Sequence, residues 1–93
     1  MRLMELKDFA GTEGSAYRAT AGEGEVELVL ESARELPDSG RVGGAFRLEF
    51  LGPSEPVLEQ ATYELSTDEE SFEIFIVPIA QTPKGTTYEA IFY

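Results

Sequence analysis

The sequence contains no cysteine and no histidine, and these two absences limit its chemistry more than any residue that is present. Without cysteine the chain has no disulfide, no thiolate nucleophile and no cysteine ligand for zinc. Without histidine it lacks the commonest general base and metal ligand. The sequence also has no Gly-x-Ser-x-Gly motif, phosphate-binding loop, dinucleotide fingerprint or zinc-ligand spacing. We therefore predict that the protein is not an enzyme and has no catalytic residues, no cofactor and no metal.

Basic residues are also scarce, because seven Lys and Arg stand against eighteen Asp and Glu, for a net charge of −11. The second half of the chain, residues 48–93, carries Lys84 as its single basic residue. Nucleic-acid binding requires clustered Lys and Arg, and acidic proteins are repelled by anionic membranes. We predict no nucleic-acid partner and no membrane partner. The charge favours a basic protein partner, or it serves only to keep the protein soluble.

Long apolar runs are missing too. No window approaches the roughly 18 apolar residues of a membrane-spanning helix, and the first residues lack the apolar segment of a signal peptide. A cytoplasmic location is therefore expected. A chain of 93 residues is long enough for one hydrophobic core and too short for two, so we predict a single β domain over residues 1–93.

What the sequence does contain is period-two alternation and short stretches rich in β-branched and aromatic residues, the patterns of β-strands. These stretches cover residues 15–20, 25–31, 46–51, 62–66, 72–79 and 87–93. A short helical turn is expected over residues 3–11, ended by Gly11. The segment 82–85 has Pro and Gly at the positions of a type I turn, which predicts a hairpin between the last two strands. Pro78 has no N–H and should lie at an edge or at the end of its strand.

These elements predict an all-β fold. We expect an antiparallel sandwich or a small open barrel of five to six strands in largely sequential order, with a short N-terminal helical turn.

The predicted hairpin has two apolar faces. With a register such as Val77 opposite Ile91, one face collects Phe72, Ile74, Ile76, Tyr88, Ala90 and Phe92. The other collects Phe75, Val77, Ile91 and Tyr93, which are candidates for an interface. We expect the N-terminal turn with Met4, Leu6 and Phe9 to cover this second face as a lid and leave some apolar surface for a partner. A second subunit or another protein is the alternative cover. With an intrachain lid, the substitution Phe75→Asp should lower thermal stability sharply.

Three further residues are binding candidates: Gln60, Tyr63 and Glu89. The amide of Gln60 either satisfies stray backbone groups or recognises a ligand. Glu89, on the outward face, either pairs with Arg47 or another base or is solvated. Tyr63 would belong to a stacking platform for a small ligand or carbohydrate, formed by Tyr17, Tyr63, Tyr88 or Tyr93.

The motifs F-R-L-E-F-L-G-P-S-E-P-V-L-E-Q-A-T-Y, F-E-I-F-I-V-P-I and Y-E-A together resemble a family of small bacterial domains of unknown function, and the resemblance spans nearly the whole chain. The matching residues are Phe46, Leu48, Phe50, Gly52, Pro53, Pro56, Leu58, Gln60, Tyr63, Pro78, Ile79, Tyr88, Glu89 and Ala90. Such domains are similar to ones encoded near phage tail-collar or tail-fibre-like genes. The resemblance thus implies a tail-associated or assembly role.

Two functions follow. The first is a non-enzymatic structural or protein-interaction module, within a phage-tail-like assembly or as a homo-oligomer. The second is a small-ligand or carbohydrate-binding β domain. A flat apolar patch would favour the first, and a concave groove lined by Tyr and Gln would favour the second.

Overall fold

The structure is a computed structural model that describes residues 8–9, 11–36 and 45–92. It contains six strands and, within these ranges, no α-helix. The strands are β1 (Ala16–Ala21), β2 (Gly24–Glu35), β3 (Phe46–Gly52), β4 (Ala61–Ser66), β5 (Ser71–Thr82) and β6 (Gly85–Phe92). The prediction of an all-β fold is confirmed. Most of the predicted N-terminal helical turn lies outside the described residues.

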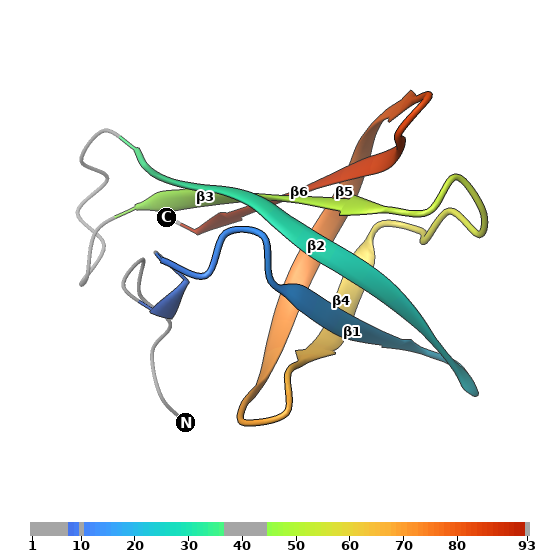
Figure 1. The fold of residues 1–93 in the computed structure, drawn as a ribbon, viewed down its shortest axis with the longest axis horizontal. Helices are drawn as coiled ribbons and strands as arrows, with labels where there is room; N and C mark the ends of the chain where they lie inside the picture. Colours follow the sequence, from blue (N-terminus) through green and yellow to red (C-terminus); the bar gives the residue numbers. More distant parts are fainter. Residues whose placement is uncertain (1–7, 10, 37–44, 93) are drawn as a thin grey trace.

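The strands close into a barrel with the order β1-β2-β3-β6-β5-β4, and every neighbouring pair is antiparallel (Figure 1). The structure thus has a barrel and not a sandwich, and the barrel is closed where we expected an open one. Its order is sequential only within two meanders, β1–β3 and β4–β6. Because β4 returns to pair with β1, the first four strands form a Greek key.

The two longest strands, β2 and β5, each serve two neighbours in turn. Residues 24–29 of β2 pair with β1, and residues 29–35 pair with β3. In the same way, residues 71–76 of β5 pair with β4, and residues 77–82 pair with β6. Because β2 and β5 each pair with two neighbours along their length, six strands are enough to close the barrel. This double pairing also explains why β2 and β5 run several residues beyond the alternating segments that predicted them.

The C-terminal hairpin is confirmed, with Thr82 opposite Gly85, but its predicted register is wrong. Val77 lies opposite Glu89 and not opposite Ile91, and the register shifts between Pro78 and Ala80. The pairing of β5 with β4 ends at Ile76, so Pro78 lies where β6 is the one described neighbour of β5, in agreement with the predicted edge position. It lies beside a bulge, which also accommodates a residue without an N–H.

The core fills the barrel with the inward residues of all six strands. Five residues of the predicted inward hairpin face, Phe72, Ile74, Ile76, Tyr88 and Ala90, are buried, and Phe92 is partly buried against them. The other buried core residues are Phe9, Tyr17, Ala19, Val26, Leu28, Leu30, Phe46, Leu48, Phe50, Leu58 and Leu65. Alternation along the two strands of this hairpin therefore identified its core face correctly.

One end of the barrel is filled by Phe9, whose side chain is 0% exposed. Its ring centroid lies 5.0 Å from that of Phe72 and 6.0 Å from that of Phe46. The expected placement of Phe9 over the outer hairpin face is therefore wrong, because Phe9 packs inside the barrel and Phe75 remains 50% exposed. Met4 and Leu6 lie outside the described residues. An open barrel end exposes core side chains, and an aromatic ring there removes more apolar area from water than it would on a strand surface.

The other end of the barrel is held by the connection between β3 and β4. Leu58 in this connection is buried, and its backbone N–H donates a hydrogen bond of 2.8 Å to the Tyr88 hydroxyl. Tyr88 is itself fully buried on β6. A single phenol oxygen thus satisfies a buried backbone donor and fixes the connection across the barrel.

Replacing Tyr88 by Phe should reveal the contribution of this hydrogen bond. The variant keeps the ring but leaves the Leu58 N–H without its partner, so we expect a loss of about 1–3 kcal/mol in the free energy of unfolding. Urea denaturation measures it. Tyr63→Phe is the matched control, because the Tyr63 hydroxyl donates to the Glu59 carbonyl at an exposed site. Equal losses in the two variants would contradict the proposed role of Tyr88.

Candidate functional site

Three of the predicted interface residues, Phe75, Val77 and Ile91, lie on the outside of the barrel, but the strand pairing does not bring them all together. Phe75 is 50% and Ile91 is 37% exposed, whereas Val77 is partly buried. Phe75 lies opposite Thr62 on β4, and Ile91 lies opposite Arg47 on β3. Phe75 therefore lies in the β4–β5 strand pair and Ile91 lies in the β3–β6 strand pair. Tyr93 lies outside the described residues.

The surroundings of Phe75 are acidic. Glu73 precedes it by two residues on the same face of β5, and Glu64 on β4 lies opposite Glu73. Both glutamates are exposed. Further along β5, Ile79 is another exposed large apolar residue. The outer face of β4 and β5 therefore combines an exposed aromatic ring with a negatively charged border.

Glu89 belongs to a network of ion pairs across the outer faces of β2, β3 and β6. Arg47 Nη2 lies 2.7 Å from Glu89 Oε2 and 3.7 Å from Glu49 Oε2. Glu49 Oε1 also lies 3.2 Å from Arg34 Nη2 and accepts a hydrogen bond of 3.3 Å from Ser32 Oγ. Of the two alternatives expected for Glu89, pairing with a basic residue or solvation, the structure shows the ion pair with Arg47. Two arginines and two glutamates balance in charge, so this cluster stabilises the barrel wall and leaves little charge for a ligand.

Gln60 is exposed just before β4. The side-chain amide that satisfies a loop carbonyl belongs instead to Gln81, whose Nε2 donates to the Ser54 carbonyl at 3.2 Å and to Thr86 Oγ1 at 3.3 Å. Sequence reasoning missed Gln81, because β5 extends further than its alternating segment indicates.

The described tyrosines do not form a stacking platform. Tyr17 and Tyr88 are buried in the core. Tyr63 is partly buried against the core, and its hydroxyl donates a hydrogen bond of 2.7 Å to the Glu59 carbonyl. A sugar or small aromatic ligand would need the open face of such a ring.

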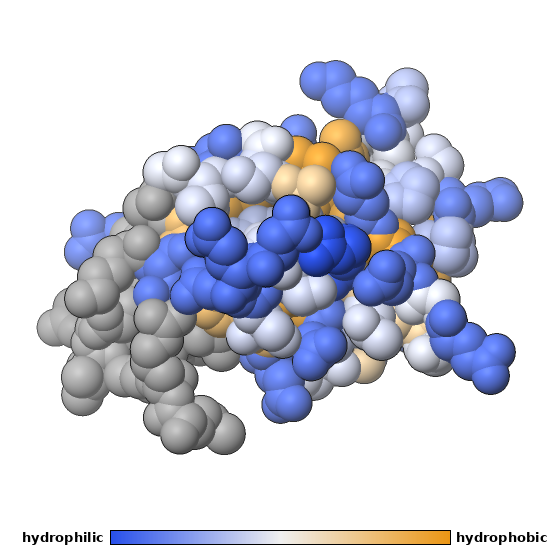
Figure 2. Space-filling model, turned by 60° about the horizontal axis from the view of Figure 1, so that its bottom comes forward, coloured by the Kyte–Doolittle hydropathy of each residue, from blue (hydrophilic) through white to orange (hydrophobic). Residues whose placement is uncertain are grey.

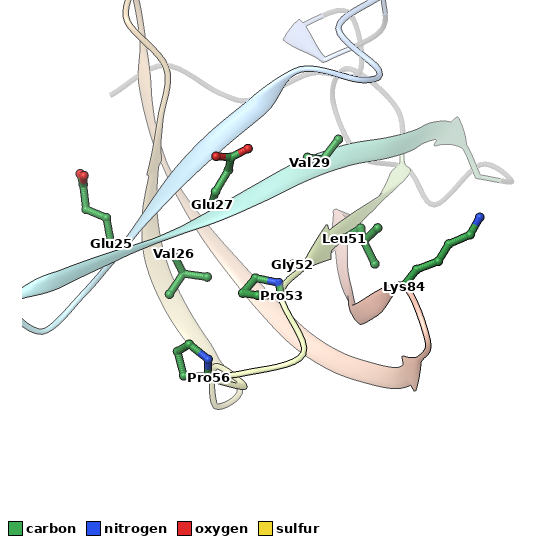
Figure 3. A pocket seen from close by; sticks show the side chains of 9 residues that line it. All are labelled: Glu25, Val26, Glu27, Val29, Leu51, Gly52, Pro53, Pro56 and Lys84. Atoms are coloured by element: carbon green, nitrogen blue, oxygen red, sulfur yellow. The ribbon is translucent and has the colours of Figure 1, made fainter.

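The structure also contains a groove that sequence reasoning missed, with a volume of about 410 Å³. It lies between β2 on one side and the β3–β4 connection and β5–β6 turn on the other (Figure 3). Its lining residues are Glu25, Val26, Glu27, Val29, Leu51, Gly52, Pro53, Pro56 and Lys84. The alternation of Glu25 and Glu27 along a strand was visible in the sequence. Barrel closure, which brings the Lys84 turn close to β2, was not.

The groove has an apolar floor and charged borders. Glu25 and Glu27 project from β2, whereas Lys84 lies on the opposite wall (Figure 3). No described ion pair includes any of these three side chains. Arg18 lies opposite Glu27 in the β1–β2 ladder, but its Nη2 is 3.2 Å from Asp68 Oδ1. The two glutamates therefore remain available to a partner.

Most of the surface around these features is hydrophilic. Figure 2 shows one face of the molecule, on which polar residues predominate and apolar residues appear in small separate areas. Among the residues that the structure describes, no three His, Cys, Asp or Glu side chains are grouped so that they could hold a metal ion. No helix in this part of the chain is long and apolar enough to cross a membrane.

Comparison with known proteins gives a family but no characterised relative. No curated protein and no solved structure matches the chain significantly. A family model described as "Domain of unknown function (DUF6916)" matches residues 4–92, which is nearly the whole chain. The resemblance to a family of small domains of unknown function is thereby confirmed, and the chain belongs to the DUF6916 family.

Proposed function

We propose that this domain is a non-enzymatic protein-interaction module that docks through the outer face of β4 and β5. The observation that carries the proposal is the exposure of Phe75, half of whose surface meets solvent although the barrel buries its other described phenylalanines wholly or partly. A large apolar side chain left on a strand surface costs hydration free energy in the free protein, and contact with a partner recovers it.

The charge around Phe75 indicates the kind of partner. A second copy of the chain would bring the carboxylates of Glu64 and Glu73 against their own counterparts, and each copy carries a net charge of −11. Like charges at an interface suppress association. The occupant we propose is therefore a different protein, with an apolar contact surface bordered by Lys or Arg. A component of a phage-tail-like assembly is the specific partner class that the family resemblance suggests.

The alternative, a small-ligand or carbohydrate-binding domain, has less support. Its expected features were a concave site lined by tyrosine and glutamine. The groove is lined by other residues, and the described tyrosines are buried or occupied.

The substitution Phe75→Asp should leave the fold intact, which reverses the expectation from the intrachain lid. Because the side chain is half exposed, we expect the free energy of unfolding to change by no more than about 1 kcal/mol. Thermal denaturation followed by circular dichroism measures this. A large fall in melting temperature would show that the described exposure of Phe75 is wrong and would return the lid to consideration.

The same variant tests the function. Proteins crosslinked to the wild-type domain in its host cells would be identified by mass spectrometry, purified and titrated against both forms. We expect a basic partner that binds the wild type and whose affinity for Phe75→Asp is at least about tenfold lower, the loss typical of a central apolar contact. Ile91→Asp, exposed on another part of the barrel, is the control. Equal binding of the partner by Phe75→Asp and Ile91→Asp would overturn the proposal. The proposal would also be overturned if the domain bound a glycan on a glycan array and no protein partner were found.

A further inference from the structure

The groove follows a stretch of β2 that has a strand on only one side. Residues 24–28 of β2 pair with β1, and pairing with β3 begins only at Val29, opposite Leu51. Figure 3 shows that the chain turns away from β2 after Gly52, the last residue of β3, and continues toward Pro53 and Pro56. One edge of β2 therefore faces the groove without a neighbouring strand.

The backbone groups on this edge can be assigned from the pairing. Leu30 donates its N–H to the Ser15 carbonyl and accepts from the Gly14 N–H, so its backbone groups point toward the β1 side. In an antiparallel ladder, successive residues direct these groups to opposite edges, and the β1–β2 register is unbroken from Val29 to Gly24. The N–H and C=O groups of Glu25 and Glu27 therefore point away from β1, into the groove.

Pro53 explains why β3 does not continue along this edge. In the register that places Val29 opposite Leu51, the next outward-directed pair would be Glu27 and Pro53. Proline has no N–H to donate to the Glu27 carbonyl. No described backbone hydrogen bond outside the strand ladders joins the β3–β4 connection to β2. The backbone N–H and C=O groups of Glu25 and Glu27 thus have no described backbone partner on this edge.

The side chains along this edge favour one kind of added strand. Glu25 and Glu27 present two carboxylates on the outer face of β2, and Lys84 supplies one cation on the far wall. Charged residues at a free edge discourage pairing with most strands, including an acidic second copy of this chain. They attract a strand that carries Lys or Arg. The alternate side chains of such a strand point to the other face of β2, where the apolar residues Val26, Pro53 and Pro56 line the groove (Figure 3).

We propose that this edge binds an extended, basic segment of a partner protein by strand addition. The segment pairs its backbone with Glu25 and Glu27, directs its Lys or Arg side chains to their carboxylates and packs apolar residues on the groove floor. This contact is separate from the Phe75 surface and does not depend on it. It adds a mode of recognition in which the backbone provides affinity and the acidic border provides specificity.

The test uses the full chain, labelled with ¹⁵N, and a short capped peptide of alternating Lys and Val as the probe. We expect binding that slows hydrogen exchange at the amides of Glu25 and Glu27, because both N–H groups become hydrogen-bonded. A peptide of the same sequence with N-methyl groups on the residues that face β2 should not bind. The same result is expected for a peptide with Glu in place of Lys.

Protein variants complete the test. The double variant Glu25→Gln with Glu27→Gln should lower the affinity for the Lys-Val peptide by about three- to tenfold, since two exposed charge pairs are lost. The matched control, Glu64→Gln with Glu73→Gln, removes the same charge from exposed positions on β4 and β5. It should leave the affinity within about twofold, and so should Phe75→Asp, which separates this site from the proposed docking face. No binding at about 1 mM peptide, unprotected Glu25 and Glu27 amides, or equal binding of the N-methylated peptide would overturn the proposal.

Discussion

Replacement of Phe9 by Ala is expected to remove about 3–5 kcal/mol from the free energy of unfolding, a large part of the stability of a domain of this size. Phe9 lies before the first strand, yet its side chain is fully buried and contacts the aromatic rings of Tyr17, Phe46, Phe72 and Phe92. Without the ring, the end of the barrel is left with a cavity or with solvent against the core. Denaturation in guanidinium chloride measures the loss.

The substitution Phe75→Ala is the matched control, because it removes the same side chain from the outside of the barrel. Half of that side chain is already exposed, so the expected loss is within about 1 kcal/mol. Comparable losses in the two variants would contradict the placement of Phe9 inside the barrel. A smaller loss for Phe9→Ala than for Phe75→Ala would support the original expectation that the N-terminal segment covers the outer hairpin face.

The second large effect is expected from Gly85→Ala at the start of β6. Gly85 has a φ of 139°, which residues with a side chain rarely adopt, and a Cβ there would overlap the Gly52 carbonyl oxygen. Neither backbone can yield easily, because Gly52 is paired with Thr86 in the β3–β6 ladder. Backbone strain and overpacking together predict a loss of about 2–6 kcal/mol.

Gly22→Ala separates the two causes. Gly22, in the β1–β2 turn, has a φ of 61°, and nothing lies within 4 Å of the position its Cβ would take. This variant carries only the left-handed strain, for an expected loss of about 1–2 kcal/mol. Thermal and chemical denaturation of both variants gives the difference. If Gly85→Ala were no more damaging than Gly22→Ala, the close approach of Gly85 to Gly52 would be refuted.

The parts of the fold that sequence could predict are those set by local patterns. Alternation in E-V-E-L-V-L-E and F-R-L-E-F-L identified strands and their buried faces, since period-two burial depends only on neighbouring residues. Strand ends and register were less predictable. The ladder that starts with Thr82 opposite Gly85 would place Val77 opposite Ala90, and the shift between Pro78 and Ala80 moves it one residue further, to Glu89. The expected partner, Ile91, therefore differs from the observed one by two residues.

The candidate sites depended on contacts between distant segments. Pairing of Glu89 with Arg47 was among the expected alternatives because both residues face outward on strands. The position of Phe9 inside the barrel and the approach of Lys84 to β2 both follow from closure of six strands, which no stretch of sequence specifies alone. For the same reason, the free edge of β2 becomes visible only when the pairing partners of each half of that strand are known.

The two junctions between the meanders, β3 with β6 and β1 with β4, differ in length. The two meanders meet along β3 and β6 from Phe46 to Gly52, but along β1 and β4 only from Arg18 to Thr20. The shorter junction holds fewer backbone hydrogen bonds, and its opening leaves the longer one unchanged. Local opening of the barrel should therefore begin between β1 and β4. The two meanders would then separate on that side while β3 and β6 stay paired and act as the hinge. The three residue pairs from Arg18 opposite Ser66 to Thr20 opposite Glu64 are thus the part of the barrel wall that should open first.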